Sequence, residues 1–408
     1  MKYDRPRSLP VSFLKKRPAL TAIVPAAISR PSNKKKVRMK AVAVTPSQKK
    51  VGIIDHPSPE LHQDDEVKVR TIDVGICGTD REICTFVYGD PPSGSKHLVL
   101  GHEAMGEIVE VGTNVSNLKV GDFVVPSVRR PCHDKTCLPC QSNLQDFCSN
   151  GNYVERGIKE CHGFMTESFV EQEQYLTHVP DDLRDLAVLT EPLTIAEKGL
   201  AQAWAAQKRL PWVQHYDGDK PTGKGLNAVI LGAGPIGILG AMTMKAAGFE
   251  TFVHNRSPAP NPKSEIIESI GAKYISSRDT PVEDLPGIVG SVDLIYEAVG
   301  ISPVAFDALS ILGVNGVYIF TGIPAPGAKI PIDANQMMRD VVLKNQAIIG
   351  TVNADDASFK AAISDLSYFK KHWPEAVESV ITKRFPMDDC RELLLDRATG
   401  IKNVISFA

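Results

Sequence analysis

Four cysteines lie close together in the stretch "CHDKTCLPCQSNLQDFC", which runs from residue 132 to residue 148 of a 408-residue chain. Thiols at this density form disulfides, act as a redox CxxC centre, or bind one metal ion as thiolates. No hydrophobic signal core of secretory type precedes them, which favours a reducing compartment and a metal or redox role. The pattern therefore predicts one site made by Cys132, Cys137, Cys140 and Cys148.

A second set of metal-binding residue types is spread along the chain. It comprises Cys77 of "GICGTD", His102 and Glu103 of "GHEAMGE", and Glu191 of "LTEPLTIAEK". Cysteine, histidine and carboxylate are the ligand types of zinc, and a catalytic site uses three of them and leaves one position open. Each residue alone has an ordinary structural explanation, so the prediction depends on the whole set.

The stretch "LGAGPIG" has the spacing of a dinucleotide-binding turn. It follows the apolar run "NAVI" and precedes a helical pattern. The first glycine allows the tight turn, the second lets a pyrophosphate approach, and the third packs helix against strand. The helix N-terminus then offers free N–H groups to the phosphates. The predicted cofactor-binding residues here are Gly232, Ala233, Gly234, Pro235, Ile236 and Gly237.

The end of the next strand, "FETFVHNRSP", predicts the choice of cofactor. An NAD-binding strand ends in an acid that binds the ribose 2′-hydroxyl, but here Asn255, Arg256 and Ser257 stand in that place. A guanidinium pairs with phosphate through a planar fork. The sequence therefore predicts NADP as the preferred cofactor and NAD as a second one.

The elements that must position these residues differ between two parts of the chain. From about 39 to 190, short β-branched runs are broken by Gly, Pro and Asp, which predicts a small, mostly antiparallel barrel. From about 191 to 350, apolar strands alternate with helical stretches, which predicts an α/β fold with a doubly wound parallel sheet. The tail has a predicted helix at 356–369 and a final strand, "KNVISFA".

Composition excludes two classes of partner. The net charge is −2, yet residues 1–39 carry eleven Lys and Arg against one acid, so the rest of the chain is acidic. The body has no electrostatic basis for binding nucleic acid, and no apolar run is long enough to span a membrane. We expect residues 1–38 to be a basic leader that is disordered or serves targeting. A cytoplasmic enzyme is expected, with organelle import if the leader is a transit peptide.

Several motifs, in order, resemble the zinc-dependent medium-chain alcohol and polyol dehydrogenases. They are "GICGTD", "GHEAMGEIVEVG", "VGDFVV", the cysteine cluster, "EP" and "GAGPIG". More narrowly, "CGTDREI", "GNYVERGI", "HGFMTE", "TEPLTIAEK" and "LKNQAIIGTVN" resemble the glucose 1-dehydrogenases of that superfamily. The resemblance covers residues 39–408. It implies a GroES-like catalytic domain at 39–194 with a zinc lobe at 132–148, a Rossmann domain at 195–350, and a return to the catalytic domain at 351–408.

The resemblance implies a structural zinc held by the four clustered cysteines. The gaps between them are four, two and seven residues, and the first is two residues longer than is usual in the family. The insertion lies in a loop that can bulge, and His133 or Asp134 could take the place of Cys132.

The resemblance also implies a mechanism. Zinc on Cys77, His102 and Glu103, with Glu191 exchanging roles with Glu103, would lower the pKa of an alcohol hydroxyl. Thr79 would accept the proton at the head of a relay, and hydride transfer from glucose would give gluconolactone. The implied sugar contacts are Thr79, Glu155, Glu191 and Asn353. The further implied cofactor contacts are Val299, Gly300, Thr351, Val352 and Lys402.

The sequence leaves the exact substrate, the alternative functions and the oligomeric state open. Val128 stands where some relatives have a sugar-binding asparagine, so the preference among sugar epimers does not carry over. A sorbitol-type polyol dehydrogenase or a threonine dehydrogenase would have the same zinc ligands. A non-catalytic nucleotide-binding relative would be expected to lack a ligand or Thr79, and all are present. The family suggests a homo-oligomer, either a dimer or a tetramer.

Overall fold

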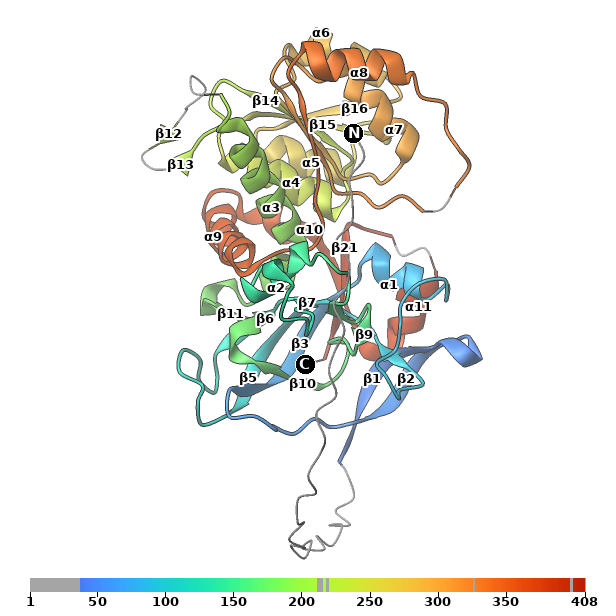
Figure 1. Cartoon of the computed structure of the whole chain (residues 1–408), viewed down its shortest axis with the longest axis vertical. Helices are drawn as coiled ribbons and strands as arrows, with labels where there is room; N and C mark the ends of the chain where they lie inside the picture. Colours follow the sequence, from blue (N-terminus) through green and yellow to red (C-terminus); the bar gives the residue numbers. More distant parts are fainter. Residues whose placement is uncertain (1–36, 211–215, 218–219, 326, 397–398, 408) are drawn as a thin grey trace, which may run out of the picture. The chain divides into compact units, whose positions relative to one another are not determined.

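The computed structural model describes residues 37–407, apart from 211–215, 218–219, 326 and 397–398 (Figure 1). The basic leader predicted at 1–38 therefore lies outside the described residues, except for Val37 and Arg38. All that follows concerns the unit formed by Val37 and the residues after it.

A six-stranded parallel sheet forms the cofactor-binding half predicted from the alternating pattern. Its order is β16-β15-β14-β17-β18-β19, and every neighbouring pair is parallel. The order reverses beside β14, as in doubly wound dinucleotide-binding folds. The strands are β14 (Asn227–Leu231), β15 (Glu250–Asn255), β16 (Lys273–Ser276), β17 (Leu294–Glu297), β18 (Val317–Phe320) and β19 (Ala347–Gly350).

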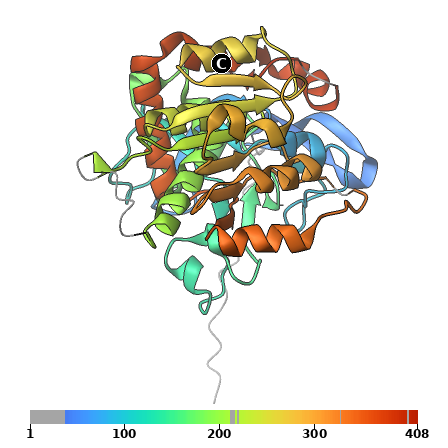
Figure 2. The same cartoon turned by 90° about the horizontal axis from the view of Figure 1, so that it is seen from above.

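Helices cover both faces of this sheet because successive side chains of each strand point to opposite faces (Figures 1 and 2). In β14, Ala228 and Ile230 join one core while Val229 and Leu231 join the other. The first core includes α3 (Thr190–Gln207), α4 (Pro235–Ala246), α5 (Pro262–Ser269), α9 (Asp356–His372) and α10 (Pro374–Val380). The second includes α6 (Pro286–Val289), α7 (Ser302–Asp307) and α8 (Ala334–Leu343).

The β-rich half is a barrel-like arrangement of mostly antiparallel strands. One sheet has the order β11-β6-β5-β3-β21-β20, with β10 also pairing with β3, and a smaller sheet has the order β2-β1-β4. The larger sheet contains β3 (Glu66–Gly75), β5 (Glu103–Val111), β6 (Phe123–Pro126), β10 (Ser168–Gln172), β11 (Leu176–Val179), β20 (Ile381–Pro386) and β21 (Lys402–Ser406). The smaller contains β1 (Arg38–Thr45), β2 (Lys50–Pro57) and β4 (Leu98–Val99).

The remaining short elements lie around the barrel and in one hairpin. A third sheet joins β7, β8 and β9, with the cysteine-bearing segment between β7 and β8. These elements are β7 (Arg129–Arg130), β8 (Val154–Arg156), β9 (Glu160–Cys161), α1 (Gly78–Ile83), α2 (Leu138–Gln141), α11 (Cys390–Leu395), and the hairpin strands β12 (Tyr216–Asp217) and β13 (Lys220–Pro221).

The predicted α/β class, with a doubly wound parallel sheet beside a mostly antiparallel barrel, is confirmed, whereas the domain bounds remain a prediction. Helix α3 runs continuously across the bound at residue 194. Helices α9 and α10 share a core with α3 and α4, so the chain re-enters the barrel sheet only at β20. The last strand, β21, then pairs with β3.

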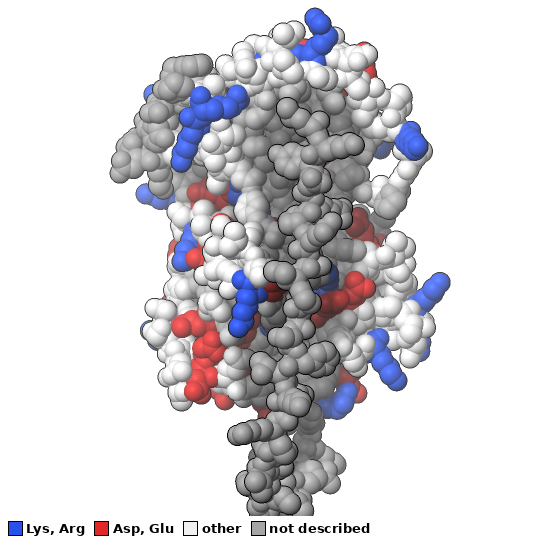
Figure 3. Space-filling model, viewed as in Figure 1, with Lys and Arg blue, Asp and Glu red and all other residues white. Residues whose placement is uncertain are grey.

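The surface charge and the helices bear on possible partners. On the face shown in Figure 3, the described basic side chains lie scattered among acidic and uncharged ones and form no continuous surface. None of the described helices is both long and apolar enough to cross a membrane.

Candidate active site and metal centres

The structure brings three predicted zinc ligands together at one end of the barrel. Cys77 caps the N-terminus of α1, His102 directly precedes β5, and Glu103 is the first residue of that strand. One candidate ligand atom from each lies within 4.8 Å of the other two. Strand β3, which leads to Cys77, pairs with β5, so the sheet register brings the three side chains together.

Asp80 holds two of these residues in place. Its Oδ2 accepts a 2.9 Å bond from the Cys77 amide, and its Oδ1 accepts a 3.2 Å bond from the Gly101 amide. Oδ1 also lies 3.5 Å from His102 Nδ1. Burial opposes the charged form of His102, yet Asp80 and then Cys77 raise its pKa well above the ordinary value. A carboxylate behind a histidine fixes the orientation of the ring and leaves Nε2 for a metal.

Glu103 fits its place because Gly75 has no side chain. The two residues are opposite each other in the β3–β5 ladder, and a Cβ on Gly75 would overlap the Glu103 carboxylate. On its other side, Glu103 Oε2 lies 2.5 Å from Lys402 Nζ, and this ammonium also donates to the Ile76 carbonyl at 3.3 Å. Both charged side chains are almost completely buried.

Glu191 completes a buried cluster of acidic groups. It is the second residue of α3, and burial raises its pKa to about 7, with His102 opposing the shift and Glu103 adding to it. Asp80, Glu103 and Glu191 are all buried, so the cluster needs compensating positive charge. Lys402 supplies one such charge, and a zinc ion bound by Cys77, His102 and Glu103 would supply two more. The donor set and this charge imbalance fit a zinc ion.

Thr79, the predicted proton acceptor, lies beside Cys77. Its hydroxyl is on the first turn of α1, and Oγ1 is 3.8 Å from Cys77 Sγ. A hydroxyl group of a substrate bound beside Cys77 would therefore be close to the Thr79 hydroxyl.

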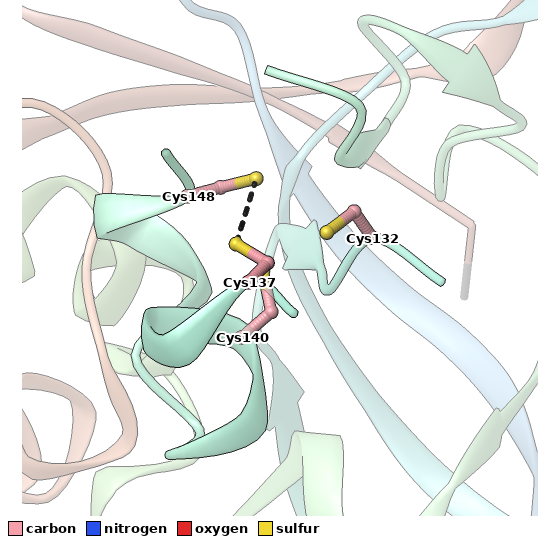
Figure 4. Close-up of side chains that lie close together, drawn as sticks. All are labelled: Cys132, Cys137, Cys140 and Cys148. Atoms are coloured by element: carbon pink, nitrogen blue, oxygen red, sulfur yellow. Dashed lines mark hydrogen bonds between the residues drawn. The ribbon is translucent and has the colours of Figure 1, made fainter. Parts of the chain in front are cut away.

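The four clustered cysteines also converge. All four sulfur atoms lie within 4.8 Å of one another, and none forms a disulfide. Figure 4 shows the sulfurs of Cys132, Cys137 and Cys148 turned toward a common space, with Cys137 and Cys148 3.9 Å apart. A hydrogen bond from Ser149 is the main cause that lowers the pKa of Cys137 to about 6, which favours the thiolate. Four converging thiols without a disulfide fit a tetrahedral zinc ion.

The two alternatives to Cys132 lie elsewhere. His133 and Asp134 are exposed, and Asp134 is occupied by bonds from Thr136 and Asn150. Cys132 is buried with the other cysteines, so the longer first gap is absorbed by an exposed bulge at 133–136.

Two buried cations connect the cysteine lobe to the rest of the molecule. Arg129 donates to the Asp146 carbonyl at 2.8 Å and to Glu155 Oε1 through Nε and Nη2, at 3.0 and 2.9 Å. Asn353 Nδ2 donates to the same oxygen at 2.9 Å. The predicted sugar-contacting residues Glu155 and Asn353 are thus hydrogen-bonded to each other. Asn353 has a φ of 58°, a conformation that asparagine tolerates better than most residues.

Lys198 makes the second connection. Its Nζ lies 2.5 Å from Asp146 Oδ2, an ionic contact with poor hydrogen-bond angles, and donates to the Val352 carbonyl at 2.9 Å. Through Lys198, helix α3 is bound both to the lobe and to the segment after β19.

The glycine turn has the geometry expected of a dinucleotide site. Gly234 caps α4, and a Cβ built there would meet nothing within 4 Å, so this face of the turn is open. A Cβ on Gly237 would overlap the Gly232 carbonyl, so helix and strand pack closely there. Thr351 Oγ1, beyond the end of β19, is buried without a hydrogen-bond partner among the described residues. The open turn and this unpaired hydroxyl fit a bound dinucleotide.

At the end of β15, one side chain is hydrogen-bonded within the protein and the next two are exposed to solvent. Asn255 Oδ1 accepts a 3.3 Å bond from the Ala233 amide, and Nδ2 donates to the Tyr274 hydroxyl at 2.8 Å. Arg256 and Ser257 are exposed. The structure therefore leaves Arg256 free to meet a ligand, while Asn255 also supports the glycine turn.

Comparison with known proteins places the chain in a family. Residues 184–407, more than half of the chain, match the family described as glucose dehydrogenase C-terminus, and residues 63–181 match the alcohol dehydrogenase GroES-like domain. The chain belongs to the glucose dehydrogenase family. It is 34% identical over 370 residues to a glucose 1-dehydrogenase of Methanocella arvoryzae, an alignment that covers 90% of this chain and 99% of that protein.

Solved structures of glucose dehydrogenases agree with this assignment. The glucose dehydrogenase of Haloferax mediterranei, solved in complex with NADP, Zn and gluconolactone, is 36% identical and aligns with a TM-score of 0.80. That alignment covers 91% of this chain and 99% of the Haloferax chain. Galactitol-1-phosphate dehydrogenase from Escherichia coli, at 20% identity and a TM-score of 0.71, has the same fold.

Several residues of this glucose dehydrogenase family member were missed from the sequence. Asp80 could have been found, because it is the third residue of a helix whose N-cap is a predicted ligand. Glu297 had no such signal. Its Oε1 accepts bonds from the Val299 and Gly300 amides at 2.8 and 2.7 Å, so it shapes a loop predicted to contact the cofactor. The remaining missed residues are Arg129, Asp146 and Lys198.

Removal of the Lys198 charge should destabilise the protein because Asp146 would remain buried and unpaired. We expect Lys198→Met to lower the free energy of unfolding, measured by urea titration, by about 3 kcal/mol. The double variant Lys198→Met/Asp146→Leu should lose less than the sum of the two single variants. Lys360→Met is a matched control, since Lys360 pairs with Asp356 on the surface and its loss should cost under about 1 kcal/mol. Equal losses in Lys198→Met and Lys360→Met would refute the role of the buried pair.

Proposed function

We propose that this chain oxidises the C1 hydroxyl of D-glucose, or of a similar aldose, to the lactone, with NADP as hydride acceptor and a zinc ion at Cys77, His102 and Glu103. The observation that carries the proposal is the convergence of these three ligands beside Thr79 in a chain of the glucose dehydrogenase family. A related structure holds NADP, Zn and gluconolactone together.

The side chains of this site have separate tasks in that reaction. A zinc ion there would act as a Lewis acid that lowers the pKa of the sugar hydroxyl. Thr79 Oγ1 would accept the proton that leaves this hydroxyl and give up its own hydroxyl proton toward solvent at the head of a relay. A bound nicotinamide cofactor would accept the hydride from C1. Asp80 keeps His102 and Cys77 oriented throughout. Lys402 holds Glu103, the third ligand, in position.

Glu155 and Asn353 are proposed to bind the sugar. The bonds from Arg129 and Asn353 all reach Glu155 Oε1, and within the described part of the chain no group donates to Oε2. Oε2 can therefore accept a bond from a sugar hydroxyl. A buried carboxylate that pairs with a hydroxyl discriminates strongly against substrates that lack it.

A substrate panel tests the proposed activity. Glucose should be oxidised with higher kcat/KM than sorbitol or threonine, because a pocket with fixed hydrogen-bond partners rejects substrates that leave them unpaired. The panel is measured with NADP and with NAD at the same protein concentration. Higher kcat/KM for sorbitol would assign the site to a polyol dehydrogenase, and absence of turnover with all three would contradict a dehydrogenase function for these substrates.

We propose zinc at both the catalytic ligands and the four-cysteine cluster. Cys77→Ser should remove about one zinc per chain, measured by metal analysis, and nearly all turnover, because the ligand set is broken. Cys140→Ser should also remove about one zinc and lower Tm, while part of the turnover remains. Either variant with the zinc content of the wild type would show that its site holds no zinc.

The cofactor proposal rests on Arg256, which is exposed at the end of β15 in the place of the usual acid. We expect its guanidinium to form a bidentate contact with the 2′-phosphate of NADP, with Asn255 and Ser257 beside it. NAD should also be used, with lower catalytic efficiency. The other proposed contacts are the turn at 232–237, Val299, Gly300, Thr351, Val352 and Lys402.

Arg256→Ala should weaken NADP selectively. A hydrogen bond to a charged group contributes roughly 1.5–3 kcal/mol, so KM for NADP should rise by about 10- to 150-fold. KM for NAD should change little, and Asn255→Asp should shift preference further toward NAD because a carboxylate repels the 2′-phosphate. Lys224→Ala, which removes an exposed lysine before β14, serves as a control for general loss of surface charge. A ratio of NADP to NAD efficiencies that stays constant in Arg256→Ala would contradict the assignment.

We further propose that the chain is a cytoplasmic homo-oligomer. Strand β19 is at the edge of the parallel sheet, and apolar side chains of β19 and α8 are exposed beside it. They include Met338, Val342, Leu343 and Ile348. An exposed apolar sheet edge favours cover by a second copy. Eight unpaired cysteines fit a reducing compartment.

A further inference from the structure

Three histidines from distant parts of the chain converge outside the active site. His56 is on β2, His97 directly precedes β4, and His162 directly follows β9. One ring nitrogen of each lies within 4.8 Å of the other two, and His56 Nδ1 is 3.1 Å from His97 Nε2. None of the three belongs to the zinc or cofactor residues described above.

The spacing of the rings is that of ligands around one ion. The ring centroids are 5.3, 4.9 and 5.1 Å apart, which is nearly an equilateral triangle. With Zn–N bonds of about 2.0–2.1 Å, three imidazoles around a tetrahedral ion have centroids roughly 5 Å apart. The pairs His56–His97 and His56–His162 are edge-on, and His97–His162 is stacked.

The rings are in the neutral form that binds metals. Burial lowers the pKa of His56 and that of His162 to about 4, and it also lowers the pKa of His97. Near pH 7, therefore, the rings do not need to lose a positive charge before they bind an ion. His162 Nδ1 accepts a 3.2 Å bond from the Val99 amide, so this ring carries its proton on Nε2. To coordinate as a neutral ring, it must give up the bond from Val99 and turn Nδ1 toward the ion.

We propose that His56, His97 and His162 form a third metal site that binds one divalent ion of the zinc, nickel and copper class. Three imidazoles without a thiolate or carboxylate suit these ions and not magnesium or calcium. Three protein ligands leave a fourth tetrahedral position for water.

The surroundings make this site weaker than the other two. Arg38 disfavours added positive charge at His56 and His97, and Arg156 does so at His162. Arg156 is held by Glu171, and Arg38 donates to the Asp55 carbonyl. We therefore expect the ion at the three histidines to be exchangeable. A chelator should remove it before it removes the ion held by the four cysteines.

A bound ion would connect strand β2 to two segments that support the active site. His97 is five residues before His102, and His162 precedes Gly163, whose amide donates to the Val99 carbonyl. A Cβ on Gly163 would overlap the carbonyls of Leu100 and Gly101, so these segments are closely packed. The site is structural in this proposal and takes no part in hydride transfer.

Zinc titration of the full-length, untagged protein tests the proposal. After a brief chelator wash, the wild type should take up about one zinc per chain more than His97→Gln or His162→Ala, measured by calorimetry and metal analysis. His178→Ala, which removes an exposed histidine elsewhere, should bind as much zinc as the wild type. Equal zinc uptake by the wild type and both ligand variants would overturn the proposal.

A measurement on the wild type alone covers the case in which the variants do not fold. Carbethoxylation of each histidine is followed by peptide mass spectrometry with and without added zinc. Zinc should protect His56, His97 and His162 and leave His178 reactive. Unchanged reactivity of all three on zinc addition would also overturn the proposal.

Discussion

Balance of buried charge is the constraint on which the site depends. Asp80, Glu103 and Glu191 are buried within one small region, and unpaired carboxylates there would be costly. The permanent cation that compensates them is Lys402, on the last strand of the chain. Lys402 reaches this region because the chain returns to the barrel after the parallel sheet, where β21 pairs with β3.

Buried cations also connect the cysteine lobe to the segments that we propose bind the sugar and the cofactor. Arg129 binds the backbone carbonyl of Asp146 in the lobe, and Lys198 binds the carboxylate of the same residue. Lys198 also donates directly to the Val352 carbonyl. Arg129 is connected to Asn353 through Glu155, because both residues donate to the same Glu155 oxygen. A metal in the lobe would therefore stabilise more than the loop that holds it. The positions of Glu155 and Val352 both depend on side chains that also contact the lobe.

Patterns of neighbouring residues in the sequence predicted much of the fold. The ion pairs between residues far apart in the sequence could not be predicted from it. The glycine turn and β14 are contiguous, and the alternation of Ala228, Val229, Ile230 and Leu231 between two cores follows from strand geometry alone. Lys402 and Glu103 are 299 residues apart, so only the folded chain shows that they pair. The sequence predicted Lys402 as a cofactor contact, and the structure adds its ion pair with Glu103.

Asn255 and the histidines illustrate the same limit. The position of Asn255 at the strand end predicted a contact with the ribose. The bond that its side-chain oxygen accepts from the Ala233 amide depends on how two strands meet. His56, His97 and His162 carry no spacing signal, because three different segments must fold before they meet.

Helix α3 sets how much length variation this architecture can accept. Glu191 and Lys198 are seven residues apart, close to two turns, so they lie on the same side of the helix. One inserted or deleted residue between them would rotate Lys198 by about 100° and separate it from Asp146. The bulge at 133–136 is exposed, and its length can change while the cysteines still meet. Among related chains, insertions should thus accumulate in the lobe and be absent from this part of α3.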